Sequence, residues 1–319
     1  MEEILAVSDL RKYFEKKAFL RRLEVIRAVD GVSFSIGTGQ TLVLAGESGS
    51  GKTTIARLIL GALEPDWGKI TFSGEMTGLD RESIARIRRE CQMIHQDPYA
   101  SLDPRMRVID IVREPLDIHG IGRPAERREM ALGALRDVKL DADDVALKYP
   151  HMLSGGQRQR VAIARAIAPK PKVIIADEPV SMLDVSVRVG ILELMKELQE
   201  RDGISFLYIT HDLSTARYVG DEIVILYMGK IVEYGKIDDV LLHPAHPYTR
   251  ALVEAISEPD PDNLTTEKKI HVNPTLDINP YQGCRFRARC PYAVERCSDE
   301  PPLEDIGGGR FVACFVKPD

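Results

Sequence analysis

The sequence of 319 residues contains no long hydrophobic run and no excess of positive charge. No stretch approaches the roughly 18 apolar residues that a membrane-spanning helix needs, and the first ten residues carry acidic but no basic side chains, unlike a secretory signal. The net charge of -6 disfavours a protein that coats nucleic acid. We therefore expect a cytoplasmic chain that does not itself cross a membrane and has no nucleic-acid partner.

Cysteine is scarce until the end of the chain. Cys91 stands alone in a predicted strand and is expected to be a small core residue. The other four cysteines follow residue 283, with the spacings C-x5-C, C-x6-C and C-x16-C. In a reducing compartment such clustering favours a metal site over disulfides, and four cysteines without histidine fit either a four-iron cluster or a structural zinc ion. The predicted ligands are Cys284, Cys290, Cys297 and Cys314.

The length limits the number of domains, because a single hydrophobic core rarely grows beyond about 250–300 residues. We predict one main domain over residues 1–256 and an extension over 257–319 that holds the cysteine cluster. The extension opens with residues 257–280, which are rich in proline, asparagine and acidic residues and show no helical or strand period. Such a segment is typical of a linker or a loop-rich strap.

Short apolar runs alternate with amphipathic segments in the main domain. The runs have the length and composition of strands that are covered on both faces. One of the helical segments between them ends at Gly203, a residue suited to a helix C-cap. This alternation predicts an α/β fold with a mostly parallel sheet, and the residues from about 97 to 165 form a predicted helical insert. The predicted strands are 41–46, 173–177, 205–210 and 222–227.

The segment GESGSGKT at 46–53 follows a predicted strand and precedes a predicted helix, as a phosphate-binding loop must. Its glycines let backbone amides turn toward phosphate oxygens, while Lys52 reaches the outer phosphates and the Thr53 hydroxyl can bind Mg²⁺. The loop therefore predicts a nucleoside triphosphate site. Its predicted binding residues are Gly46, Glu47, Ser48, Gly49, Ser50, Gly51, Lys52, Thr53 and Thr54.

The segment VIIADEP at 173–179 supplies the second half of that site. Four apolar residues bury the strand, and Asp177 emerges at its carboxyl end, where ligands bind in open parallel sheets. We expect Asp177 to hold Mg²⁺ through water. Glu178 then faces the phosphates and is the candidate for polarising the attacking water.

Four further motifs accompany these two in a fixed order. They are LSGGQ at 153–157, Gln96 in a long QDPYASLDP segment, SMLD at 181–184, and His211 after a predicted strand. Together the six motifs resemble the ATP-binding cassette (ABC) family over about residues 3–255. The resemblance implies a P-loop ATPase fold with a mostly parallel core sheet, an antiparallel β subdomain and a helical subdomain.

In this family two cassettes stack head to tail, and the resemblance assigns roles on that basis. The turn from Ser154 to Gln157 would lie over the ATP of the partner, where Ser154 and the amides of Gly155 and Gly156 favour an anion. His211 would position the water and the terminal phosphate, and Gln96 would reach Mg²⁺. The remaining implied contacts are Asp184 with the opposite cassette and Tyr13 with adenine, although Tyr13 can also be a core aromatic.

Finer segments resemble the dipeptide and oligopeptide importers, a group that also takes up nickel and oligosaccharides. They include YPHMLSGGQRQR, HPAHPYTRAL at 243–252, and extra residues before AVDGVSF that look like the second of two cassette subunits. The implied function is ATP hydrolysis that powers import, on the cytoplasmic face of a membrane. The implied partners are a non-identical cassette, two transmembrane permease subunits and, indirectly, an external binding protein. The sequence does not identify the cargo.

The alternatives differ in what they leave unexplained. Soluble ABC ATPases that act on DNA or ribosomes typically carry long coiled coils, inserted domains or two cassettes in one chain, and none is visible here. A redox-responsive regulator would not need complete ATP machinery. Several family members carry an iron-sulfur cluster in the extension, which favours [4Fe-4S] over zinc. The interleaved arginines, including Arg285 and Arg289, would offset thiolate charge or form a solvated basic loop.

Overall fold

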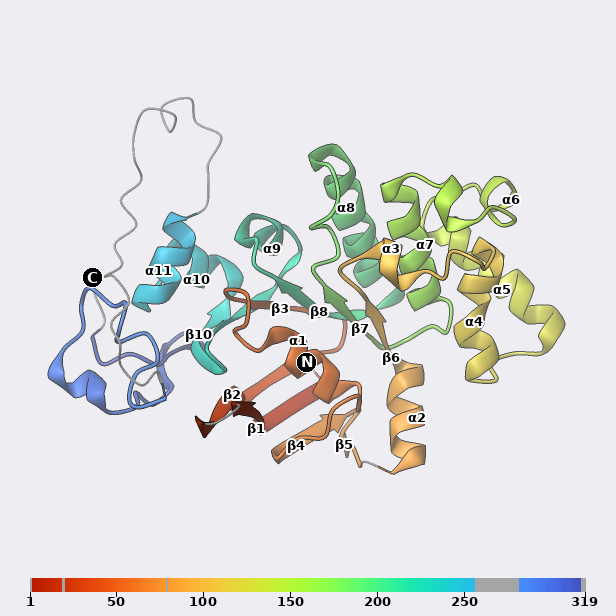
Figure 1. Ribbon diagram of the computed structural model, residues 1–319. Coiled ribbons are helices and arrows are strands. Elements are labelled where there is room, and N and C mark those ends of the chain that lie inside the picture. Colours follow the sequence, from red (N-terminus) through yellow and green to blue (C-terminus); the bar gives the residue numbers. More distant parts are fainter. Residues whose placement is uncertain (1, 19–20, 79, 256–280, 317–319) are drawn as a thin grey trace.

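The computed structural model describes residues 2–18, 21–78, 80–255 and 281–316. The predicted linker at 257–280 lies outside these residues. The described chain forms two sheets and a group of helices at one end of the molecule (Figure 1).

The larger sheet has eight strands in the order β11-β12-β10-β9-β3-β8-β7-β6. The four pairs from β9 to β6 are parallel, and the pairs from β9 outward to β11 are antiparallel. Every residue of β3, β7 and β8 is buried, as their apolar runs predict. The strands are β3 Thr41–Ala45, β6 Cys91–Ile94, β7 Val173–Asp177, β8 Ser205–Thr210, β9 Glu222–Tyr227, β10 Lys230–Lys236, β11 Glu304–Gly307 and β12 Arg310–Val312.

A smaller antiparallel sheet, in the order β2-β1-β4-β5, covers one side of the larger sheet (Figure 1). Its inward residues share a core with β3 and with helix α1, Lys52–Ile59. The antiparallel subdomain that the family resemblance implied is therefore present. Its strands are β1 Glu3–Ala18, β2 Arg21–Gly37, β4 Trp67–Phe72 and β5 Glu75–Met76.

The segment predicted as a helical insert forms helices that gather at one end of the molecule (Figure 1). Their apolar faces pack together and against the main core. The predicted bounds of this subdomain, like the division at residue 256, stay predictions. The helices are α3 Pro98–Ser101, α4 Val108–Ile118, α5 Pro124–Asp137, α6 Ala142–Val145, the 3-10 turn η1 Pro150–Met152 and α7 Gly155–Ile167.

The remaining helices flank the sheets. Helix α8 ends as predicted at Gly203, whose φ of 67° is the left-handed conformation that glycine adopts without steric cost. The other helices are α2 Arg81–Glu90, α9 Leu213–Val219, α10 Ile237–Leu242 and α11 Pro247–Glu254, and α8 spans Val185–Asp202.

The C-terminal extension joins the main sheet, which its loop-rich sequence did not predict. Strand β12 pairs with β10 through Val312 and Phe311, so the extension adds two strands to the sheet edge. Arg310 also donates to the buried carboxylate of Glu233, 3.0 Å away. The extension and the cassette therefore share a hydrogen-bonded sheet.

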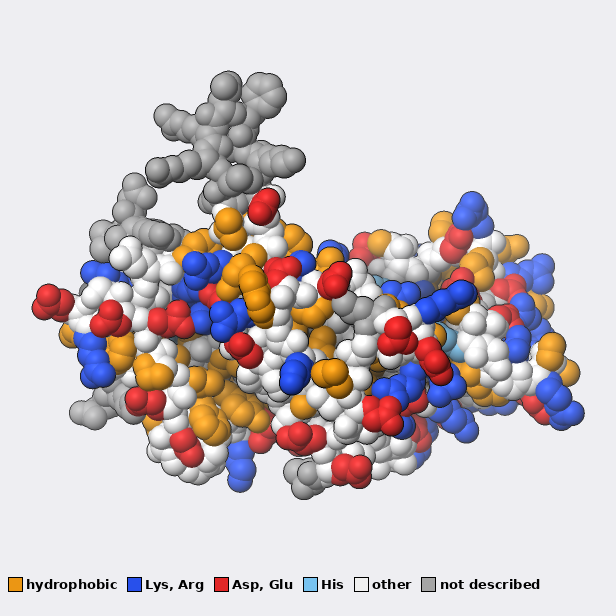
Figure 2. Space-filling view, turned by 90° about the horizontal axis from the view of Figure 1, so that it is seen from below, with side chains coloured by type: hydrophobic (Ala, Val, Ile, Leu, Met, Phe, Trp, Pro, Cys, Tyr) orange, Lys and Arg blue, Asp and Glu red, His pale blue; other side chains and the backbone are white. Residues whose placement is uncertain are grey.

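The surface in Figure 2 mixes positive, negative and hydrophobic side chains over the described residues. This face carries no continuous basic strip of the kind that follows a nucleic-acid backbone. Among the helices that the structure describes, none combines the length and apolar character needed to cross a bilayer.

Candidate functional site

The predicted phosphate-binding loop connects β3 to α1. Gly51 is the N-cap of α1 with a φ of 110°, and a Cβ added there would lie 2.2 Å from the carbonyl oxygen of Ala28. Only glycine fits this position, because both the backbone angle and the space exclude a side chain. The cap makes no side-chain hydrogen bond, so the first amides of α1 remain available to an anion.

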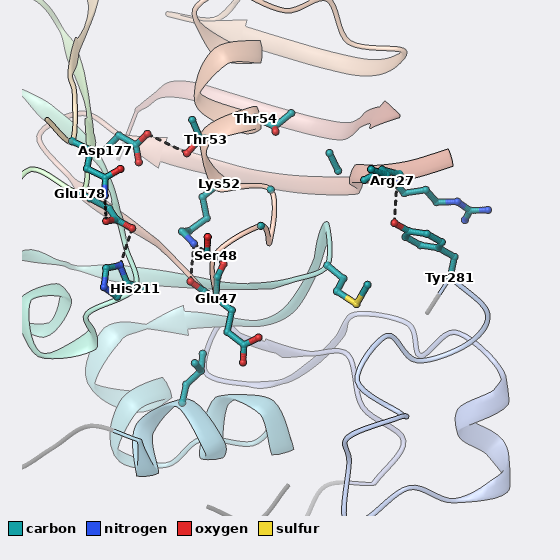
Figure 3. A pocket seen from close by; sticks show the side chains of 18 residues that line it. Arg27, Glu47, Ser48, Lys52, Thr53, Thr54, Asp177, Glu178, His211 and Tyr281 are labelled. Carbon is teal, nitrogen blue, oxygen red and sulfur yellow. Dashed lines mark hydrogen bonds and ion pairs between the residues drawn. The ribbon is translucent and has the colours of Figure 1, made fainter. Parts of the chain in front are cut away.

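This loop borders a cavity of about 1000 Å³ that collects residues from distant parts of the chain (Figure 3). The predicted site residues Gln96, Asp177, Glu178 and His211 line it together with the loop. Ser50 does not line it but lies buried, with its Oγ 3.4 Å from Lys52 Nζ. The loop residues in the lining are Gly46, Glu47, Ser48, Gly49, Gly51, Lys52, Thr53 and Thr54.

The charged residues at the centre of the cavity fit Mg²⁺ and phosphate. Thr53 Oγ1 donates to Asp177 Oδ2 at 3.1 Å, which places two hard oxygen ligands side by side. Burial raises the pKa of Asp177, and Glu178 adds to this effect, while Thr53 and Lys52 oppose it. Burial likewise lowers the pKa of Lys52. A cation beside Asp177 and a phosphate beside Lys52 would each favour the charged form of these groups.

Glu178 is held at both carboxylate oxygens. Gln96 Nε2 donates to Oε2 at 2.7 Å, and His211 Nδ1 lies 2.7 Å from Oε1. The backbone of Glu178 has a φ of 47°, an uncommon left-handed conformation for a residue with a side chain, and its amide donates to the carbonyl of Ile209. These constraints aim a carboxylate into the cavity, next to Lys52 and Asp177 (Figure 3).

The LSGGQ turn lies apart from this cavity, at the N-terminus of α7. Ser154 and Gln157 form a capping box, in which each side chain accepts a hydrogen bond from the other residue's amide. A Cβ on Gly156 would lie 2.5 Å from Val187, so this turn packs against the start of α8. Asp184, the exposed N-cap of α8, also lies outside the cavity lining. Ser154, Gly155, Gly156, Gln157 and Asp184 are therefore not brought to this chain's own phosphate loop.

Tyr13 does not line the cavity either. Its hydroxyl donates to Asp30 Oδ1 at 2.6 Å, and its ring lies 5.5 Å from that of Trp67. Its predicted stacking on adenine stays a prediction, while its contacts match the other interpretation, an aromatic packed within the β subdomain.

The sequence did not predict the far end of the cavity. Ile26 and Arg27 of β2, Met228, Leu252 of α11 and Tyr281 of the extension also line the cavity. Figure 3 shows Arg27 and Tyr281 together at its far end. The available signals in the sequence were the basic Arg27 and the aromatic Tyr281, but no local pattern indicated that the segments containing them meet.

Two arginines of the extension bind the main domain. Arg289 Nη1 donates to Glu47 Oε2 at 3.0 Å and its Nη2 to Oε1 at 3.2 Å, a bidentate pair with the phosphate loop itself. Arg285 is buried and pairs with the equally buried Asp30. The alternative of a solvated basic loop is wrong for these two side chains, because both have carboxylate partners outside the cysteine cluster. That they offset thiolate charge stays a prediction.

The four C-terminal cysteines line a second, far smaller cavity beside Phe286 and His246. No disulfide joins them, and burial raises the pKa of Cys284 and of Cys314 to about 11, with the neighbouring thiols adding to the effect. Within the described ranges, no three histidine, cysteine or acidic side chains come close enough together to hold a metal ion. Cys284, Cys290, Cys297 and Cys314 thus line the same cavity, but their side chains are not spaced as ligands of one metal ion. Cys91 is buried in the core, as predicted.

The chain matches two family profiles, one described as ABC transporter over residues 29–181 and one described as Oligopeptide/dipeptide transporter, C-terminal region, over residues 232–297. A Brucella ovis protein named for peptide import and ATP binding is 44% identical over 314 residues, which are 98% of this chain and 97% of the relative. The Dipeptide transport ATP-binding protein DppF of Haemophilus influenzae is 42% identical over 316 residues, 98% of this chain and 96% of the relative.

Solved structures show the same fold. The dimeric MJ0796, a bacterial ABC transporter cassette, has a TM-score of 0.65 and 32% identity over 73% of this chain and 98% of that chain. The protein cbiO1 from Clostridium perfringens, part of the ABC transporter complex cbiONQ, has a TM-score of 0.66 and 27% identity over 76% of this chain and 92% of that chain. The predicted P-loop cassette fold is thus confirmed. The chain belongs to the ABC transporter family, as an ATP-hydrolysing cassette of its oligopeptide/dipeptide transporter group.

Proposed function

We propose that this chain hydrolyses ATP to power the import of peptides, or of related small solutes, from the cytoplasmic face of a membrane. The names of its relatives and the match of residues 232–297 to the oligopeptide/dipeptide transporter region support this proposal. The alternative, an ABC ATPase that acts on DNA or ribosomes, is not favoured, because that C-terminal match is specific to transporters.

The observation that carries the ATPase part of this proposal is that neighbouring side chains hold both carboxylate oxygens of Glu178. With Gln96 at one oxygen and His211 at the other, its carboxylate is oriented to accept a proton from a water in the cavity. That water attacks the terminal phosphorus, the bond from this phosphorus to the bridging oxygen breaks, and ADP leaves. Lys52 and the loop amides balance charge on the phosphate oxygens. Mg²⁺ held near Thr53, Asp177 and Gln96 would neutralise further phosphate charge.

A second cassette completes the reaction cycle in this proposal. The LSGGQ turn lies outside this chain's own cavity and presents the exposed residue Ser154 at a helix N-terminus, which supports its use on the ATP of a partner. Met182 and Val185, 59% and 75% exposed beside Asp184, supply apolar surface for such a seam. We further propose that the partner is a non-identical cassette, because the residues before AVDGVSF resemble the second of two subunits.

Membrane partners follow from an import function. The closing motion of the cassettes would be transmitted to two permease subunits near Gln96 and residues 96–106. An external binding protein would deliver the cargo. Tyr99, 61% exposed on α3, lies in this segment with the guanidinium of Arg158 4.1 Å from its ring centroid. Because Arg158 follows the LSGGQ turn on α7, this contact supports a mechanical link from membrane to nucleotide.

We also propose that the four C-terminal cysteines hold a [4Fe-4S] cluster, with zinc as the alternative. Their convergence on one cavity supports a shared ligand. Their long spacings favour the larger cluster over a single ion. Its role would be to fold and dock a segment that has few apolar residues of its own.

Glu178→Gln tests the ATPase mechanism in the assembled transporter. We expect ATP binding within about twofold of the wild type and hydrolysis at least about 100-fold slower, because the base is lost while the shape is kept. Glu197→Gln is the matched control, since Glu197 on α8 forms an exposed ion pair with Lys139, which lies outside that helix. Unchanged turnover in Glu178→Gln would refute its role. If two polytopic membrane proteins and a second cassette do not co-purify with this chain, the importer assignment is refuted.

A further inference from the structure

The nucleotide cavity ends in a wall that belongs partly to the C-terminal extension. Arg27 and Tyr281 form this wall, and Figure 3 shows them together, away from Asp177 and Glu178. Neither belongs to the six motifs that define the ATP site.

Tyr281 is fixed in this wall by specific contacts. The amide of Arg27 donates to the Tyr281 hydroxyl at 3.3 Å, and the guanidinium of Arg27 lies 5.5 Å from the centre of the ring. The guanidinium of Arg285 lies 4.7 Å from the same ring. A tyrosine ring beside a guanidinium offers the flat, polarisable surface on which aromatic bases pack.

The path from the phosphate loop leads to this wall. The loop runs close to β2, because a Cβ added at Gly51 would lie 2.2 Å from the carbonyl oxygen of Ala28, the residue that follows Arg27. A triphosphate bound to the loop amides would therefore place the rest of the nucleotide along β2, toward Arg27 and Tyr281. Arg289 fixes the extension against the phosphate loop through its bidentate ion pair with Glu47.

We propose that Tyr281 is a nucleotide-binding residue, whose ring packs against the base of ATP beside Arg27. The extension then completes the ATP site of its own chain, in addition to carrying the cysteine cluster. This inference rests on the proposed function only in that ATP binds at the phosphate loop.

The test compares ATP with inorganic triphosphate, which has the phosphates but no base. Titration calorimetry on the full-length chain with Mg²⁺ measures both ligands for wild type, Tyr281→Leu and Tyr281→Phe. We expect Tyr281→Leu to weaken ATP binding about tenfold, because stacking on the ring is lost, and Tyr281→Phe to stay within about threefold of the wild type. The affinity for inorganic triphosphate should remain within about twofold in all three proteins.

The possible results distinguish the role of Tyr281 from the assignment of the phosphate loop. Equal weakening of ATP and triphosphate in Tyr281→Leu would mean that the ring only docks the extension, and it would overturn the proposal, as would unchanged ATP affinity. A wild type that binds neither ligand would instead overturn the assignment of the loop. If Tyr281→Leu does not fold, Tyr281→Trp in a Trp67→Phe background carries the test: its emission should change with ATP and not with triphosphate, and the reverse would refute the contact.

Discussion

The ion pair between Arg285 and Asp30 is the buried link between the extension and the β subdomain. Their side chains are 3% and 4% exposed, and the pair joins positions 255 residues apart. Asp30 also accepts from Tyr13 and lies 3.5 Å from Arg27 and 4.0 Å from Lys230, so it keeps partial compensation when Arg285 is removed. Arg285→Met removes the charge and keeps most of the side-chain volume.

The expected cost is the balance of two effects. Removing one partner of a buried pair costs about 3–5 kcal/mol, and the lower end applies because Asp30 keeps other partners. Arg285 Nε and Nη1 are buried without a hydrogen-bond partner in the described chain, and their removal returns about 1 kcal/mol. The net loss is about 2 kcal/mol, which corresponds to a fall in Tm of roughly 4 °C for a chain of this size.

Thermal unfolding of the full-length chain, followed by circular dichroism, measures this loss. Arg105→Met is the matched control, because Arg105 pairs with Asp103 at 2.8 Å while 87% exposed, and an exposed pair contributes about 1 kcal/mol or less. Asp30→Asn should cost less in the Arg285→Met background than in the wild type, since the stranded charge is then gone. Equal Tm shifts in the Arg285 and Arg105 variants, or full additivity with Asp30→Asn, would refute the reasoning.

Two further predictions concern pH and metal content. Burial raises the pKa of Asp30, but the hydrogen bond from Tyr13 and the charges of Lys230, Arg285 and Arg27 outweigh it, and the pKa is lowered overall. The stabilisation is therefore complete above the unfolded pKa of about 3.9 and lost as the pH falls through the lower, folded value. The denaturant midpoints of wild type and Arg285→Met should begin to approach each other below about pH 4 and meet only below the folded pKa; a constant difference would contradict this. Anaerobically purified protein should contain iron and sulfide at about four each per chain, lost in Cys290→Ser and kept in the buried control Cys91→Ala; zinc without iron would refute the cluster.

Much of the fold was predictable because its signals are local. Apolar runs of five or six residues predicted β7, β8 and β9 with their observed bounds, and Gly203 predicted the end of α8. The phosphate loop predicted its own geometry, since strand, glycines and helix lie next to one another in the chain. The resemblance of the motifs to the ABC family then implied that Gln96, Glu178 and His211 meet at one site, and all three line the same cavity.

What the sequence could not predict depends on contacts between distant segments. The partners of Arg289 and Arg285 lie 242 and 255 positions away, and no local pattern distinguishes them from solvated basic residues. The pairing of β12 with β10 and the place of Tyr281 in the cavity have the same origin. The sequence by itself thus determined the ATPase cassette, because each motif that carries this chemistry is a short continuous segment of the chain. Only the tertiary structure decided that the cysteine extension lies against the phosphate loop, because burial of Asp30 and pairing with Glu47 exist only in the folded chain.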